Sequence, residues 1–167
     1  YYPFYGHITN FRIVSGTAVY TANFAPVPPL TAITNTQLLL LANSDLNKTA
    51  DSSVNNFTVT NTGGVLYSST VVPTYLAIAP IPTNLITPVQ GGGSFNGTSQ
   101  YLTAPIGAST FGSGDFTAEC WFYKTSATTC TLLSNATGNA DNNYWSLSTY
   151  ADGHCQFTIR DATSQLY

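Results

Sequence analysis

Charged side chains are scarce in this chain of 167 residues. They make up 7% of it, with four Lys or Arg against seven Asp or Glu, whereas a typical globular domain carries about 25%. Solubility must therefore come mainly from Ser, Thr, Asn and Gln. The four cations, Arg12, Lys48, Lys124 and Arg160, are spread along the chain. They form no basic stripe that could neutralise phosphates, so we expect no nucleic-acid binding.

Long apolar runs and methionine are missing as well. The longest apolar run, residues 38–42, is far too short to cross a bilayer, so no membrane insertion is expected. The chain has no Met and begins with Tyr1. We take this to indicate a processed product or a segment of a longer polypeptide.

Cysteine is rare and has no motif spacing. Cys120, Cys130 and Cys155 contain no C-x-x-C pair, which argues against a zinc site and against a redox motif. The odd number leaves at least one thiol unpaired within the chain. Three buried thiols and a single intrachain disulfide are both compatible with this sequence.

Strand-forming residues dominate what remains. We find no convincing helical periodicity, while Thr, Val, Tyr, Phe and Ile are abundant and are interrupted by Gly, Pro, Asn and Ser, as in sandwiches and barrels. The predicted strands are residues 7–14, 37–42, 56–60, 116–123, 129–134, 144–149 and 154–160. A hairpin turn is expected at residues 151–153, because Asp-Gly tolerates positive φ.

Alternation and proline refine this prediction. In residues 7–14 the set Thr9, Phe11 and Ile13 is the more apolar and is expected to face the core. Residues 25–30 and 72–93 are rich in Pro, and the second stretch ends in three Gly. The first should be extended and polyproline-like, and the second a loop or linker.

Several segments carry a family resemblance. Residues 6–20, GHITNFRIVSGTAVY, resemble the closing strand of laminin-G-like repeats in phage structural proteins. Residues 51–59 (DSSVNNFTV), 94–102 (SFNGTSQYL) and 111–122 (FGSGDFTAECWF) are similar to opening segments of such a repeat. The resemblance implies an antiparallel, all-β, concanavalin-like jelly-roll sandwich.

The order of these segments predicts the domain organisation. The closing strand comes first, so residues 1–34 are interpreted as the end of one copy and residues 35–167 as the opening strands of the next. The sandwich would then be incomplete, or split between tandem copies. The alternative is a circular permutant, in which residues 1–20 complete the sheet that begins at Phe116.

Catalytic chemistry finds little support. Asp115 and Glu119 are the obvious carboxylate pair, but four strand residues at ~3.3 Å each would separate them by about 13 Å. Glycoside hydrolysis needs roughly 5 to 9.5 Å. His7 and His154 lack any nucleophile signature nearby. No catalytic residue is therefore predicted, and the chain is not expected to be an enzyme.

Calcium is a weaker possibility. The resemblance implies acidic residues in the segment 94–102, where this chain has Asn96 and Gln100 instead. Asp141 and Asp152 remain as oxygen ligands that calcium could use. Turn formation explains these Asp residues equally well, so neither a metal nor another cofactor is predicted.

Aromatic side chains suggest a ligand. Rings can stack on the C–H faces of sugars while Asn side chains bind the hydroxyls, although core packing is the competing role for each ring. The predicted ligand-binding residues are Trp121, Tyr144, Trp145, Tyr150, Asn142 and Asn143.

The resemblance gives these residues a context. We expect a non-enzymatic structural module of a phage fibre or virion surface, extracellular and homo-oligomeric, which binds a host cell-surface glycan, another receptor or other virion proteins. The alternatives are a purely architectural capsid decoration or filament subunit held by self-association and, last, a glycan-degrading enzyme.

Overall fold

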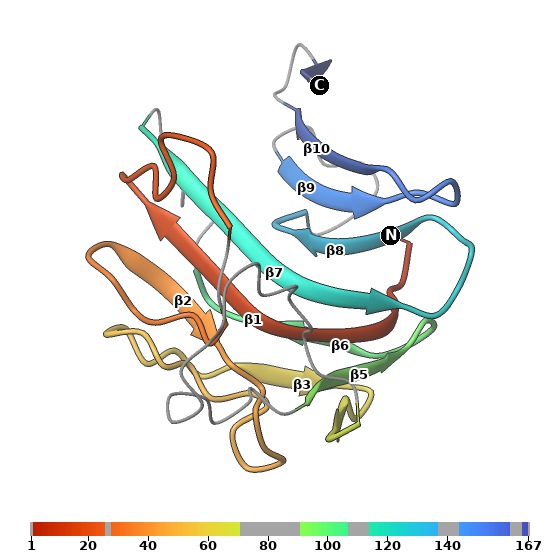
Figure 1. Cartoon of the computed structure of the whole chain (residues 1–167). Coiled ribbons are helices and arrows are strands. Elements are labelled where there is room, and N and C mark those ends of the chain that lie inside the picture. Colours follow the sequence, from red (N-terminus) through yellow and green to blue (C-terminus); the bar gives the residue numbers. More distant parts are fainter. Residues whose placement is uncertain are drawn as a thin grey trace, which may run out of the picture.

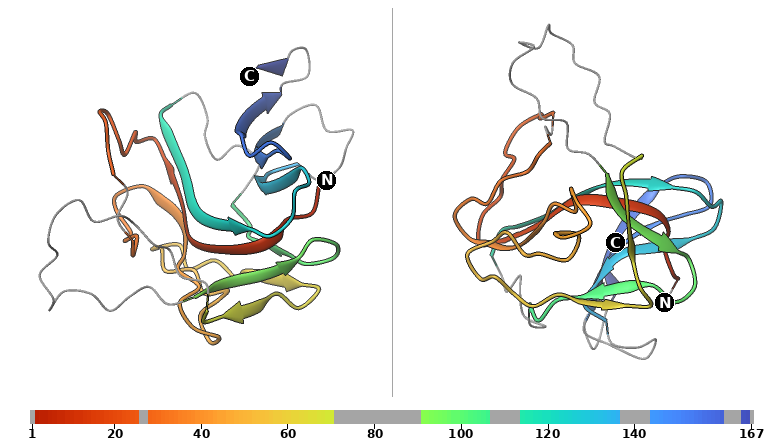
Figure 2. Two further views of the ribbon diagram at one scale, coloured as in Figure 1. Left: turned by 45° about the vertical axis from the view of Figure 1, so that its right-hand side comes forward. Right: turned by 90° about the horizontal axis from the view of Figure 1, so that it is seen from below.

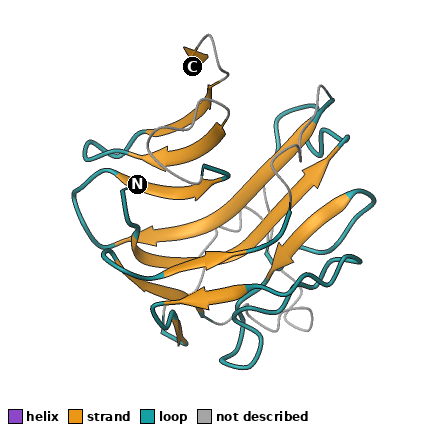
Figure 3. Ribbon diagram, turned by 180° about the vertical axis from the view of Figure 1, so that it is seen from behind, coloured by secondary structure: helices purple, strands orange, loops and turns teal. Residues whose placement is uncertain are grey.

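The computed structural model describes residues 2–25, 28–70, 91–106, 114–136 and 144–160, together with the backbone of 165–166. Within these ranges the chain is all-β and contains no helix (Figure 3). Every strand pairing is antiparallel. The predicted all-β, antiparallel class is thereby confirmed, and the arrangement is consistent with a β-sandwich.

Six of the predicted segments, 7–14, 37–42, 116–123, 129–134, 144–149 and 154–160, correspond to strands, whereas the strands at residues 66–68, 92–96, 101–103 and 165–166 were not predicted. They are β1 (Tyr5–Ser15), β2 (Thr36–Leu40), β3 (Thr60–Thr62), β4 (Leu66–Ser68), β5 (Gly92–Asn96), β6 (Tyr101–Thr103), β7 (Phe116–Lys124), β8 (Cys130–Ser134), β9 (Tyr144–Thr149), β10 (Cys155–Arg160) and β11 (Gln165–Leu166). The predicted strand at 56–60 is displaced, since Thr58 forms only an isolated bridge with Ala50 and β3 begins at Thr60.

The strands form two main sheets. In the larger sheet β1 is central, with β7 along one side and β2 and β5 sharing the other, and β4 lies beyond β5. This sheet is strongly curved, and β8, β9 and β10 stand over its concave side (Figure 1 and Figure 2). The smaller sheet has the order β11-β10-β9-β8, and β3 pairs with β6 separately.

The core lies between the two sheets. Phe11, Ile13, Leu38 and Leu40 of the large sheet cluster with Trp145 of the small one. A second cluster joins Phe4, Val65, Phe95 and Cys130 near the other end of β1. The burial of these side chains between facing sheets supplies the main favourable free energy of folding.

Strand β1 departs from the predicted facing pattern. Its register with β7 shifts between Thr9 and Arg12, where Asn10 has φ of 50°. This bulge reverses the alternation. Ile8, Phe11 and Ile13 therefore pack in the core clusters, whereas Thr9 lies opposite Trp121 on the other face. The expectation that Thr9 faces the core is wrong.

The outer face of β1 is also buried along its second half. Asn10, Arg12 and Val14 are as buried as their core-facing neighbours. The segment that contains Leu30 and Thr31 covers this face, since Leu30 N–H donates to Asn10 and Arg12 donates to the Thr31 carbonyl. The sequence pattern predicted only one buried face, because it could not place this crossing segment.

Two further predictions meet the structure only in part. Gly92 and Gly93 belong to β5 rather than to a loop. A side chain at Gly93 would lie 3.3 Å from Phe95 and 3.4 Å from Val65, so glycine permits close packing here. The rest of that predicted loop, residues 72–90, and part of the predicted polyproline stretch, residues 26–27, lie outside the described residues.

The position of β1 also bears on the domain organisation. Residues 5–15 pair with β2, β5 and β7, so both segments of the predicted division contribute to one sheet. The circular-permutant alternative requires the pairing of residues 5–15 with β7. The division into two copies stays a prediction.

Glycine at position 6 has a steric reason and gives a first prediction. Gly6 has φ of 150°, and a Cβ there would lie 2.1 Å from the backbone oxygen of Tyr123. Because backbone of the neighbouring strand must move, Gly6→Ala is expected to lower the free energy of unfolding by about 1–3 kcal/mol. Chemical denaturation measures this change.

Gly64→Ala is the matched control. Gly64 also has positive φ, but a Cβ added there would meet nothing within 4 Å. This substitution should cost only the backbone strain, about 1 kcal/mol. Equal losses for both variants would contradict the steric explanation.

Candidate functional site

An aromatic row crosses the outer face of the large sheet. Ile8 and Phe122 pack toward the second core cluster, where Phe122 contacts the buried Phe4 edge-on at 6.3 Å. Because neighbours on a strand alternate, His7 and Tyr123 project from the opposite face. Both are directly opposite each other in register, and their rings lie 6.4 Å apart.

The row continues across four strands. His7 lies opposite Ser94 of β5, and Ser94 lies opposite Leu66 of β4. We call the outward-facing set Tyr5, His7, Ser94, Leu66, Trp121 and Tyr123 the outer aromatic face. None of its members is an Asp, Glu, Lys or Arg, so the face suits an uncharged ligand.

Exposure distinguishes this face from the core. Tyr123 is 59% exposed, Leu66 64% and Tyr5 50%, while Trp121 and His7 are half-buried. Two aromatic residues on alternate positions of β7 therefore lie side by side at the surface. Trp121 is the member of this face that the sequence predicted as a ligand-binding residue, and that role stays a prediction.

His7 adds a polar group to the face. Its Nδ1 is buried and has no hydrogen-bond partner among the described residues. Burial also lowers the pKa of His7 below its ordinary 6.5, because desolvation disfavours the charged imidazolium. At neutral pH the ring is therefore neutral and can offer one nitrogen to a ligand hydroxyl.

A second group forms at the turn between β9 and β10. The predicted hairpin is confirmed, with Gly153 at φ of 91° and Tyr150 N–H donating to the His154 carbonyl at 2.9 Å. The Tyr150 and His154 rings stack at 4.3 Å. The Tyr150 hydroxyl lies 2.6 Å from Gln156 Oε1.

The Asp152 carboxylate contacts His154 within this turn. Its carboxylate accepts from His154 N–H at 3.2 Å and lies 2.5 Å from His154 Nδ1. The backbone N–H of His154 is the main cause that lowers the pKa of Asp152. The described residues hold no group of three side chains suited to a metal. Asp141, the other calcium candidate, lies outside the described residues.

The remaining predicted ligand-binding residues lie elsewhere. Trp145 is only 8% exposed and stacks on Phe157 in the core, so its ring offers little surface to a ligand. Tyr144 is half-buried at the start of β9, next to Arg160 in register. Asn142 and Asn143 lie outside the described residues.

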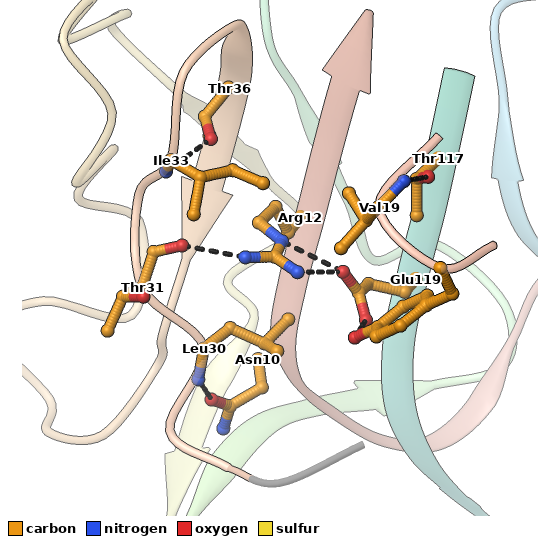
Figure 4. Close-up of polar contacts among 10 residues, drawn as sticks. Asn10, Arg12, Val19, Leu30, Thr31, Ile33, Thr36, Thr117 and Glu119 are labelled. Atoms are coloured by element: carbon orange, nitrogen blue, oxygen red, sulfur yellow. Dashed lines mark hydrogen bonds and ion pairs between the residues drawn. The ribbon is translucent and has the colours of Figure 1, made fainter. Parts of the chain in front are cut away.

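A buried ion pair explains Glu119. Arg12 Nε and Nη2 lie 2.8 and 2.5 Å from Glu119 Oε1, and the Tyr20 hydroxyl donates to Oε2 at 2.7 Å (Figure 4). Arg12 Nη1 also donates to the Thr31 carbonyl at 2.8 Å. Glu119 is therefore paired, and Asp115 is exposed just before β7.

Asn96 and Gln100 organise a loop. Asn96 Oδ1 accepts the backbone N–H groups of Thr98 and Ser99 at 3.0 Å. Gln100 Nε2 donates to the carbonyls of Gly63 and Gly64 at 3.1 and 2.7 Å. A carboxylate could not donate these bonds, so the amide at position 100 has a structural role of its own.

The Arg12–Glu119 pair and the outer row were not predicted from the sequence. The only sequence signal for the row is the alternation of Trp121 and Tyr123 on one face of a strong strand.

Among the described residues there is no helix that could span a membrane. Comparison with known proteins finds no matching family model, no similar curated protein and no similar solved structure.

Proposed function

We propose that this chain is a non-enzymatic binding module with a laminin-G-like jelly-roll sandwich, carried on the surface of a phage fibre or virion. Its ligand is an uncharged carbohydrate segment of a host glycan, bound on the outer aromatic face. The phage context rests on the sequence resemblance alone. The site rests on the exposed aromatic row.

The observation that carries the proposal is the placement of Tyr123 beside Trp121 and His7. Sugar rings stack their C–H faces on aromatic rings, and hydroxyls need hydrogen-bond partners within reach. Tyr123 offers an exposed ring, and the half-buried His7 ring and the Ser94 hydroxyl supply polar groups in the same row. The absence of charge in the row fits a neutral ligand.

The second candidate is an architectural subunit held by self-association. Tyr5 and Leu66 are exposed on the same face, and a second copy of the chain would bury them. The hydrophobic effect favours such burial. A homo-oligomer of this kind would cover the row that the first proposal leaves open to sugar.

Glycan-array binding by the full chain tests the first proposal. Tyr123→Ala is expected to weaken binding to the recognised glycan about tenfold, the effect of roughly 1.4 kcal/mol. Tyr101→Ala is the matched control, since Tyr101 is 56% exposed on β6, outside the outer aromatic face. Binding should be the same with calcium and with a chelator.

Other outcomes separate the alternatives. Equal losses for Tyr123→Ala and Tyr101→Ala would place the ligand elsewhere. Absence of all binding, together with a Tyr123-dependent oligomer in analytical ultracentrifugation, would favour the architectural subunit. Binding abolished by chelation would revive calcium.

A further inference from the structure

Two contacts fix β7 against β10 across the sandwich. The rings of Phe116 and Phe157 lie 5.4 Å apart at one end. At the other end Lys124 Nζ donates to the Tyr150 carbonyl, at the turn that precedes β10, at 2.7 Å. The start of β7 thus lies near the middle of β10, and its end lies near the start of β10.

One cysteine lies between these contacts on each strand. Cys120 is midway between Phe116 and Lys124, on the face that packs against the first core cluster. Cys155 lies between Tyr150 and Phe157, two residues before Phe157, so it shares the inward face of that ring. Cys155 is exposed, so a solute can reach its thiol.

The remaining cysteine is poorly placed to compete. Cys130 and Cys155 both lie opposite Thr149, one on each side of β9. Two strand spacings of ~4.8 Å put their Cα atoms about 10 Å apart, beyond the roughly 7 Å limit for a disulfide. Cys130 is also fully buried, and its thiol lies 3.4 Å from the Thr128 carbonyl.

We propose that Cys120 and Cys155 are a redox-active pair that forms a disulfide between the two sheets when the chain meets a small disulfide oxidant such as oxidised glutathione. Both cysteines are free thiols in this structure. The bond would join β7 to β10 and hold the sheets together between the two contacts described above.

The chemistry is a two-step thiol–disulfide exchange. The Cys155 thiolate attacks one sulfur of oxidised glutathione, the glutathione S–S bond breaks, and one glutathione leaves as a thiolate that takes up a proton. Cys120 then loses its proton to solvent and attacks the Cys155 sulfur, releasing the second glutathione. Two cysteine thiols are oxidised, and one glutathione disulfide is reduced to two thiols.

The second step should be slow and pH-dependent. Burial raises the pKa of the Cys120 thiol to about 12, and the nearby Cys155 and Glu119 add to this effect. The thiolate fraction of Cys120 therefore rises about tenfold for each pH unit below that value. Closure of the bond should accelerate by the same factor per unit.

Peptide mass mapping of the folded full chain tests the pair. The protein is incubated with oxidised glutathione, quenched with acid and alkylated in denaturant. The expected product links the Cys120 peptide to the Cys155 peptide and leaves Cys130 alkylated. Its denaturation midpoint should rise and should return to the starting value on reduction with dithiothreitol.

Single variants identify the steps. Cys120→Ser should stop at a glutathione adduct on Cys155, and Cys155→Ser should show no link, whereas Cys130→Ala should link like the parent chain. The proposal is overturned if the unsubstituted chain stops at the glutathione adduct, or if it forms the Cys120–Cys155 disulfide only in denaturant. This holds whatever the variants show. Glycan binding is scored separately, so its failure leaves this result intact.

Discussion

Replacing Arg12 with methionine is expected to lower the free energy of unfolding by about 3–5 kcal/mol, the range for removing one partner of a buried ion pair. The side chains of Arg12 and Glu119 are 5% and 13% exposed. Without the guanidinium, the Glu119 carboxylate keeps the Tyr20 hydroxyl as its donor, and the Thr31 carbonyl loses the bond from Arg12. Urea denaturation measures the loss.

The pair Lys48–Asp45 is the matched control. These side chains meet at 2.7 Å, but the Asp45 side chain is 73% exposed, and an ion pair open to solvent contributes about 0–1 kcal/mol. Lys48→Met should therefore have little effect. The double variant Arg12→Met with Glu119→Leu should recover much of the lost stability, because no unpaired charge stays buried. A similar loss for Arg12→Met and Lys48→Met would contradict the assignment.

The Arg12–Glu119 pair also shows where sequence reasoning ends. Its partners are 107 residues apart, and nothing in either local segment indicates the other. The two strands themselves were predictable, since alternation and β-branched or aromatic residues mark residues 7–14 and 116–123. Their adjacency required the three-dimensional arrangement.

The bulge at Asn10 was also not predicted from the sequence, and it changes which side chains of β1 point toward the core. Local alternation assigns Thr9 and Phe11 to one side, but the extra residue in β1 places them on opposite faces. Pattern reasoning assumes an uninterrupted period of two, and a bulge breaks that assumption without a sequence signal as clear as Asp-Gly. The Asp152-Gly153 turn was predicted because its backbone requirement is local.

The predicted site residues show the same limit of local sequence information. Trp121 was predicted from its residue type on a strong strand, and it lies on the outer aromatic face. Trp145 has the same residue type but is buried against Phe157. The residue type indicates what a ring can bind, but the face of the strand on which the ring lies decides whether the ring is accessible. That face is buried where the other sheet packs against it.

Replacing Asp51 with alanine is the second substitution with a large expected effect, about 3 kcal/mol of lost stability. Its buried carboxylate accepts the backbone N–H groups of Leu39, Ser53 and Phe57 at 3.0, 2.8 and 2.8 Å, and the Ser53 hydroxyl at 2.8 Å. Alanine leaves these donors without an acceptor. Thermal or urea denaturation at pH 7 measures the loss.

The contribution of Asp51 to the free energy of unfolding is expected to depend on pH. Burial alone would raise the pKa of Asp51, but the N–H donors of Ser53, Phe57 and Leu39 outweigh it and hold the pKa below its ordinary 3.8. The unfolded chain therefore binds the proton more readily than the folded one between these two values. The stability contributed by Asp51 is fully present above pH 3.8 and is lost as the pH falls through the folded-state value.

Asp51→Asn separates this effect from other carboxylates. It keeps the size of the side chain but cannot titrate, so the acid-dependent loss assigned to Asp51 should disappear from its stability curve. Asp45→Asn is the control, since the Asp45 side chain is 73% exposed, and it should leave the curve close to that of the parent. An unchanged acid limb in Asp51→Asn would show that the carboxylate is not the acceptor that joins β2 to the 51–57 segment.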